Sequence, residues 1–121
     1  SGDSAGNIDP MTLKGVGPIK SIELPQTIDE SLASKGEEIF KSKCTACHQI
    51  DSKVIGPALR GITKRRTPEW IMNMILNPEN MLKEDPLAKQ LLKEHNNVMM
   101  TNQNLTQEEV RAVLEYLRKN S

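Results

Sequence analysis

Cys44-Thr45-Ala46-Cys47-His48 is the stretch that decides the fold of this 121-residue chain. The run has the pattern Cys-x-x-Cys-His, which is the attachment signature of a c-type haem. Each cysteine sulfur can form a thioether bond to the edge of the macrocycle, and the histidine that follows carries an imidazole that can bind the iron. The motif therefore predicts one covalently attached haem c, with Cys44 and Cys47 as tethers and His48 as an axial ligand.

Other uses of a Cys-x-x-Cys pair fit the rest of the sequence less well. The chain has two cysteines in all, and both lie in the motif. A thioredoxin-like redox pair would accompany a βαβ pattern, and the sequence shows none. A zinc site needs about four ligands, and His95 is the one other histidine. A disulfide between Cys44 and Cys47 would close too short a loop to stabilise the chain much.

Composition points in the same direction as the motif. The chain has one Trp, one Tyr and one Phe, which is little for a core of this size, and a haem would supply a large apolar body for side chains to pack against. The formal net charge is zero, so nucleic acid is not an expected partner. No apolar run approaches the roughly 20 residues of a membrane span. The small, polar residues 1–7 resemble a flexible tether, so contact with a membrane is expected only through a possible N-terminal anchor.

Helical spacing of apolar residues predicts an all-α fold with several short helices around the haem. Helices are expected over about 32–43, from Thr67-Pro68 to Asn77-Pro78, from Asp85-Pro86 to about His95, and from the capping box Thr106–Glu109 onward. Nothing in the sequence has the pattern of a strand. Gly36 inside the first helix costs about 1 kcal/mol relative to Ala, which indicates a close contact between helices at that position.

Residues 1–30 are expected to form an irregular N-terminal extension, and residues 31–121 the haem domain. Glycine and proline interrupt the extension, and no helical period runs through it. Its scattered apolar residues favour a segment that wraps the domain, and a disordered tail is the alternative.

The chain resembles class I c-type cytochromes, the small one-haem electron carriers, over about residues 31–119. The features that carry the resemblance are Gly36 and Phe40 ahead of Cys44-x-x-Cys47-His48, then Gly56-Pro57-x-Leu59-x-Gly61, Trp70, a methionine in a late loop, and Leu105-Thr106-x-Glu108-Glu109 at a helix start. The resemblance implies a cytochrome c fold in which the first and last helices cross. The residues that match this crossing are Gly36, Phe40, Leu114, Tyr116 and Leu117.

The resemblance also implies a set of axial ligands. The carbonyl of Pro57 would accept a hydrogen bond from the nitrogen of His48 that does not bind iron. A methionine of the late loop would be the sixth ligand, which raises the reduction potential. We prefer Met100 to the adjacent Met99, with His95 as a rival. The family usually has proline after this methionine and Thr101 stands there instead, so the choice stays open.

Two further residue types are implied for the haem propionates. Trp70 would donate its indole N–H to a propionate, as the matching residue does in many relatives, or it would pack in the core. Arg65, together with Arg60 and Arg66, is a weaker candidate for the same contact. No catalytic residue is predicted.

The resemblance implies a one-electron carrier rather than an enzyme, because two axial ligands leave no open position on the iron. The expected partners are redox proteins of a respiratory chain, such as a terminal oxidase or an upstream quinol-oxidising complex. The expected location is the periplasm or the outward-facing side of a membrane, and the expected state is a monomer. Two alternatives stay open: a haem domain of a larger respiratory enzyme, and a haem gas sensor or enzyme with a labile sixth ligand.

Overall fold

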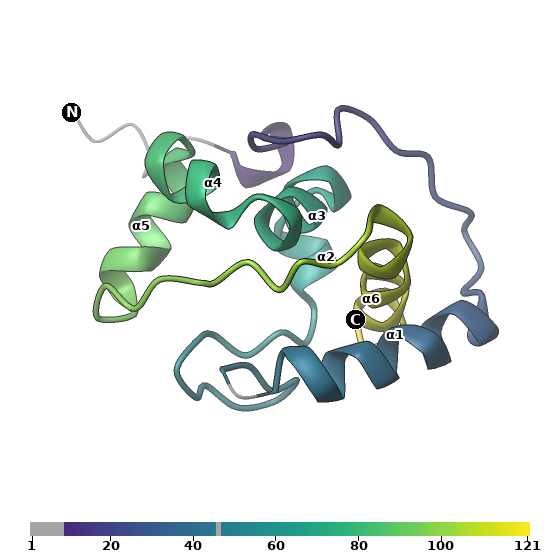
Figure 1. Cartoon of the computed structure of the whole chain (residues 1–121). Coiled ribbons are helices and arrows are strands. Elements are labelled where there is room, and N and C mark those ends of the chain that lie inside the picture. The colour runs from purple at the N-terminus through teal and green to yellow at the C-terminus, as the bar shows by residue number, and fades with distance from the viewer. Residues whose placement is uncertain (1–8, 46) are drawn as a thin grey trace.

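The computed structural model describes residues 9–45 and 47–121, and these residues form helices and no strands (Figure 1). In chain order the elements are the 3₁₀ turn η2 (Pro10–Thr12) and the helices α1 (Glu30–Lys43), α2 (Ile62–Arg65), α3 (Pro68–Leu76), α4 (Pro78–Glu84), α5 (Pro86–Glu94) and α6 (Gln107–Lys119). The all-α prediction is confirmed. None of the helices in the described part of the chain is long and apolar enough to cross a bilayer.

Short polar side chains start the helices where the sequence predicts. Thr67 accepts a hydrogen bond from the amide of Trp70 at the start of α3, and the predicted capping box between Thr106 and Glu109 opens α6. Helix α4 was not predicted. Asn77-Pro78 ends α3 and at once begins α4, because Pro78 cannot continue the first helix but suits the first position of the next one. Helix α2 was also missed, since its four residues follow a glycine-rich loop.

Helices α1 and α6 cross in close contact, with backbone against backbone (Figure 1). Gly36 is buried at the crossing, and a Cβ atom placed there would lie 1.9 Å from the carbonyl oxygen of Ala112. One turn further along α1, the rings of Phe40 and Tyr116 pack with their centroids 5.3 Å apart. The close contact predicted from a glycine inside a helix is confirmed.

Residues 13–29 form an extended segment, here called the N-terminal strap, that passes over α3 and reaches the start of α1 (Figure 1). Buried polar side chains bind its backbone. Asn73 is fully buried, accepts a hydrogen bond from the amide of Ile19 at 3.0 Å, and donates to the carbonyls of Lys14 and Ile19. Glu69 accepts from the amide of Ile22 at 3.0 Å. These side chains satisfy backbone groups that regular secondary structure leaves unpaired. Residues 1–8 of the expected extension lie outside the described residues, and the domain boundary at 30/31 stays a prediction.

Glu115 of α6 is fully buried, and its side chain binds the backbone at the end of the strap. Its carboxylate accepts from the amide of Asp29 at 2.7 Å and pairs with Arg111 at 2.6 Å and Arg118 at 2.9 Å. Burial alone would raise the pKa of Glu115, but the Asp29 amide and the two guanidinium groups outweigh it and hold the pKa below its ordinary value.

Glu115→Gln is expected to lower the free energy of unfolding at pH 7 by about 3 kcal/mol, because two arginines lose a buried partner. The folded-state pKa of Glu115 is lowered, so the contribution of its carboxylate is complete above the ordinary value of 4.5 and is lost as the pH falls through the lowered pKa. Urea unfolding between pH 7 and pH 3 measures both effects. The variant should show a flatter pH dependence than the unmodified protein, whereas Glu38→Gln, at an exposed position of α1, should change neither quantity. An unchanged pH slope in Glu115→Gln would contradict the assignment.

Candidate haem-binding site

The Cys-x-x-Cys-His motif forms a tight turn at the end of α1. The amide of Cys44 still donates to Phe40 in the last turn of the helix, at 2.8 Å. The amides of Cys47 and His48 both donate back to the carbonyl of Cys44, at 3.2 and 2.9 Å. This turn brings the three side chains to one wall of a single cavity. The arrangement is the one that two thioether tethers and an adjacent axial ligand require.

The thiol of Cys44 does not have the electrostatics of a redox-active cysteine. Both cysteines are free, with Cys44 half-buried and Cys47 exposed. Burial, and next the neighbouring Cys47, raise the pKa of Cys44 to about 11. Catalytic Cys-x-x-Cys pairs instead have a lowered pKa that makes a thiolate available near neutral pH. This observation disfavours the thioredoxin-like alternative.

The loop from 48 to 61 holds the imidazole of His48 in place. The Nδ1 atom of His48 lies 3.1 Å from the carbonyl oxygen of Pro57, and since a carbonyl can only accept, Nδ1 is the donor. Nε2 is then left with a free lone pair for a metal. Burial lowers the pKa of His48, the contact with Pro57 opposes this, and the charge of His95 adds to the lowering. The neutral imidazole, which is the form that binds iron, is therefore favoured.

Gly56, which the sequence analysis used only as part of the family resemblance, is also a residue of the site. A Cβ atom at this position would lie 2.4 Å from Cε1 and 2.7 Å from Nδ1 of His48. The amide of Gly56 also donates to the carbonyl of Cys47 at 2.7 Å, which ties the loop to the motif. Glycine before proline is visible in the sequence, but its contact with the histidine ring depends on how the loop closes.

The rest of the cavity is largely apolar, and the two candidate methionines border it. It is lined by Ile71, Met74, Ile75, Leu82, Leu91 and Leu92, with the loop from 95 to 103 at its edge. Met99 and Met100 both border the cavity, but Met99 is 58% exposed, whereas Met100 is partly buried and packs against the core. The structure thus gives the two neighbours different surroundings.

Trp70 is buried and lines the cavity, and its indole N–H has an acceptor within the protein. The N–H donates to a carboxylate oxygen of Asp85 at 2.8 Å, and the same oxygen accepts from the amide of Ala88 and so caps α5. Sequence patterns identified Asp85 as a helix start and gave no signal of the tryptophan 15 residues earlier. In the described structure, the predicted propionate donor is thus engaged by a buried carboxylate.

The arginines proposed for the propionates are not gathered at the cavity. Arg65 is exposed and donates to the carbonyls of Arg60 and Ala58. Arg60 is also exposed and pairs with Asp51. Arg66 lies with its guanidinium 5.4 Å from the centroid of the Trp70 ring, and its Nε is buried without a hydrogen-bond partner among the described residues. Of the three, Arg66 is the one beside a residue of the cavity wall.

The residues of the cavity fit a covalently attached haem. Two thiols, an imidazole and a thioether line one cavity whose other lining is largely apolar, as an iron porphyrin requires. Gly56 leaves the imidazole room that a larger residue would take. The chemistry of the donor set and the shape of the cradle therefore agree.

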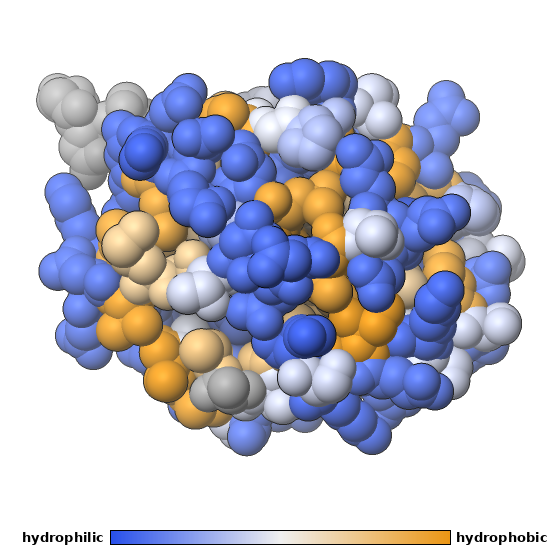
Figure 2. Space-filling view, viewed as in Figure 1, coloured by the Kyte–Doolittle hydropathy of each residue, from blue (hydrophilic) through white to orange (hydrophobic). Residues whose placement is uncertain are grey.

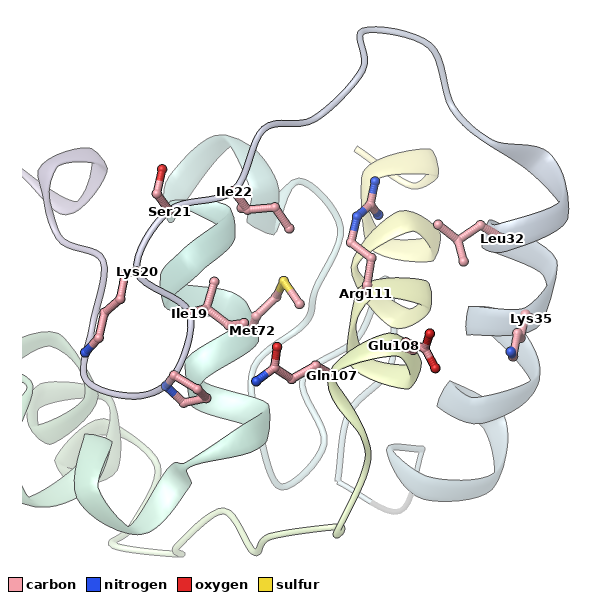
Figure 3. Close-up of a pocket in the computed structure, with 11 residues that line it drawn as sticks. Ile19, Lys20, Ser21, Ile22, Leu32, Lys35, Met72, Gln107, Glu108 and Arg111 are labelled. Atoms are coloured by element: carbon pink, nitrogen blue, oxygen red, sulfur yellow. The ribbon is translucent and has the colours of Figure 1, made fainter.

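A second cleft of the molecule is larger but does not have the donors for haem attachment. It lies between the strap, α3, α1 and α6 (Figure 3), and its free volume is about 600 Å³ against about 250 Å³ in the cavity beside the motif. Charged side chains of Lys20, Lys35, Glu108 and Arg111 surround it, with Met72 at its base. None of its described lining residues carries a thiol or an imidazole. Donor chemistry, and not volume, selects the cavity at the motif.

Comparisons with known proteins also support a haem-binding site in this chain. A family model described as Cytochrome c matches residues 33–121. The solved structure of a cytochrome c from Rhodothermus marinus has a TM-score of 0.86 and 49% sequence identity, over 92% of this chain and 96% of that one. An engineered form of that protein, bound to a carbene intermediate, has a TM-score of 0.79 and 48% identity, over 85% of this chain and 88% of that one.

A curated relative, the cytochrome c-551 of Stutzerimonas stutzeri, is 50% identical over 36 residues. The match covers 29% of this chain and 35% of the relative, so the chain spans about a third of the length of this relative. The further matches include cytochrome c2 of Rhodopseudomonas palustris, 47% identical over 34 residues, or 28% of this chain and 29% of the relative.

Proposed function

Because the chain belongs to the cytochrome c family, we propose that it carries single electrons to a terminal oxidase or reductase of a respiratory chain, on a haem held in the cavity beside the motif. Like the other members of this family, the chain carries haem c on a cysteine pair, which here is Cys44 and Cys47, and it is an electron carrier and not an enzyme. The observation that supports the proposal is the largely apolar cavity that both cysteines, His48 and Met100 line together.

The side chains that would hold the haem are already fixed in place, which suits electron transfer with little structural change. When bound, the haem supplies one-electron chemistry between ferrous and ferric iron. The hydrogen bond to Pro57 holds His48 in one tautomer and one orientation, so its ring would bind the haem iron without having to reorient. Cys44 and Cys47 would tether the haem, and the apolar side chains that line the cavity would pack against it and limit the access of water. Since all of these groups are in place beforehand, the cost of reorganisation is low.

The proposed sixth ligand is Met100, which is supported by its contact with the core and by the exposure of Met99. Met100→Ala is expected to abolish the weak far-red absorption band that a methionine–iron bond gives the ferric protein. It is also expected to lower the reduction potential by a few tenths of a volt, within the range of about 0.8 V that axial ligands span. Optical spectroscopy and potentiometric titration measure the two effects.

Met99→Ala is the matched control, because it removes the same side chain at the adjacent, exposed position. This variant should keep both the band and the potential. If the band is lost in Met99→Ala and survives in Met100→Ala, then the assignment is reversed. Ready binding of carbon monoxide by the unmodified ferrous protein would count against a closed electron carrier and in favour of an open haem site.

An apolar rim beside the cavity supports docking of redox partners. Val54, Ile55, Val98 and Met99 are each about half exposed, on the two loops that border the cavity. Figure 2 shows apolar surface at the lower left of the view, where Figure 1 places these loops. Redox encounters use small interfaces, so a rim of this kind suits a transient partner.

We place the protein in the periplasm or on the outward-facing side of a membrane, because covalent haem attachment in this family takes place outside the cytoplasm. Fractionation of native cells, with haem staining of each fraction, tests the location. Haem-stained protein in the cytoplasmic fraction would contradict it.

A further inference from the structure

His95 lies in the haem cavity on the same loop as the proposed sixth ligand. It caps the end of α5, where its amide donates to the carbonyls of Leu91 and Leu92, and its side chain lines the cavity together with His48 and Met100. It is also the one histidine besides His48 in the whole chain. The cavity therefore contains both imidazoles of the protein.

The imidazole of His95 has an unused nitrogen. Its Nδ1 atom is buried and has no hydrogen-bond partner among the described residues. A buried polar atom without a partner costs about 1–3 kcal/mol, so such an atom needs an explanation. Leu91 and Leu92, to which the backbone amide of His95 donates, also line the cavity, and their side chains supply no donor. Imidazole is the commonest metal ligand among side chains, so His95, which lines the cavity, is a potential ligand of an iron held there.

The loop between His95 and Met100 permits an exchange of one for the other. The described residues 96–105 contain no helix, so no regular hydrogen-bond ladder must break for the segment to move. Asn96 and Asn97 both have left-handed backbone conformations, with φ of 61° and 60°, which asparagine adopts at lower cost than most residues. The two ligand candidates are five residues apart along this irregular segment.

We propose that His95 is a reserve axial ligand, which binds the haem iron when the thioether of Met100 leaves it. The inference rests on the proposed function of the site. In the exchange an iron–sulfur bond breaks and an iron–nitrogen bond forms from the lone pair of the neutral imidazole, with no electron gained or lost by either side chain. An iron with two imidazoles favours the ferric state more than one with a thioether, so the exchange lowers the reduction potential while keeping small ligands off the iron.

The first experiment uses the untagged, haem-loaded Met100→Ala variant with ¹⁵N-labelled histidine. Because the chain has two histidines, the number of coordinated histidine nitrogens identifies the ligands. Pulsed electron paramagnetic resonance of the ferric variant should show a low-spin iron with two histidine nitrogens, whereas the unmodified protein should show one. One coordinated histidine in the variant would overturn the proposal. Two in the unmodified protein would overturn both the reserve role and Met100 as the resident ligand.

The second experiment compares double variants. Met100→Ala/His95→Ala is expected to lose the low-spin spectrum and to bind carbon monoxide readily in the ferrous form. Met100→Ala/Met99→Ala and Met100→Ala/Lys93→Ala, which remove the other potential ligands close to His95 in the sequence, should stay low-spin. His95→Ala alone should keep the methionine–iron band. A low-spin spectrum that survives in Met100→Ala/His95→Ala would show that another group replaces Met100, and would refute the role of His95 while leaving the proposed electron carrier intact.

Discussion

Gly36→Ala is expected to lower the free energy of unfolding by about 3 kcal/mol, the largest effect on stability of any single methyl group added to this protein. The added Cβ would lie 1.9 Å from the carbonyl oxygen of Ala112 and 2.4 Å from its carbonyl carbon. These atoms belong to the backbone of α6, so no side chain can rotate away. The two helices must separate, and the packing of Phe40 against Tyr116 is disturbed with them.

This result is opposite to what helix propensity predicts. Alanine is better than glycine by about 1 kcal/mol inside a helix, so the same change on an exposed face stabilises. Ser34→Ala, at an exposed position of α1, is the matched control and should change stability by only a few tenths of a kcal/mol. Thermal unfolding followed by circular dichroism measures both variants, and the loss in Gly36→Ala corresponds to a fall in Tm of about 10 °C. A Tm equal to or above that of the unmodified protein would contradict the close crossing.

Gly56→Ala is expected to have the largest effect on the site itself. The new methyl group would overlap the ring of His48, at 2.4 Å from Cε1 and 3.0 Å from Nε2. The backbone at Gly56 is not left-handed, so the backbone tolerates alanine and the effect is confined to the ring. The imidazole must turn, which breaks its hydrogen bond to Pro57 and moves Nε2 away from its place in the cavity.

The expected result is a weakening of the imidazole–iron bond by roughly 10- to 100-fold, as loss of the partner of a ligating histidine typically causes. Optical spectroscopy and urea titration of the ferric protein measure the strength of this bond. The variant should show a high-spin component in its spectrum, and His48 should dissociate from the iron at a lower urea concentration. Pro57→Ala is the control, because it changes the same loop and keeps the carbonyl that accepts from His48. Gly56→Ala with the spectrum and the urea midpoint of the unmodified protein would contradict the contact.

Local sequence patterns were sufficient for most of the fold. Periodic apolar residues and polar caps located α1, α3, α5 and α6, and the capping box at Thr106 is formed as expected. Helix α4 was not predicted, because a proline at the end of a helix gives the same sequence signal whether a loop or another helix follows. The hydrogen bonds to the N-terminal strap were not predicted for a different reason. Its backbone is bound by Glu69, Asn73 and Glu115, which are 47 to 86 residues away in the sequence, and polar residues inside helical patterns carry no signal of their distant partner.

The site was predictable to the extent that its residues are adjacent in the chain. Cys44, Cys47 and His48 stand within one turn, so their spacing, together with the cysteine count and the other motifs of the chain, predicts haem attachment. The difference between Met99 and Met100 was not predictable, since neighbours in a loop have the same local sequence and differ only in which one meets the core. The hydrogen bond from Trp70 to Asp85 was not predictable either. The acceptor of a buried indole N–H is the polar group that the packing of the fold places beside it, and local sequence does not show which group that is.

The sequence by itself determined the cofactor, the all-α class and the presence of a close helix contact at Gly36, because covalent spacing, helical period and the absence of a side chain are properties of neighbouring residues. Only the tertiary structure decided which methionine is packed, which carboxylate takes the indole of Trp70, how Gly56 makes room for His48, and that His95 lines the same cavity. These are contacts between segments far apart in the chain. Such contacts depend on how the helices and loops close around the cavity, and no local pattern of residues encodes that closure.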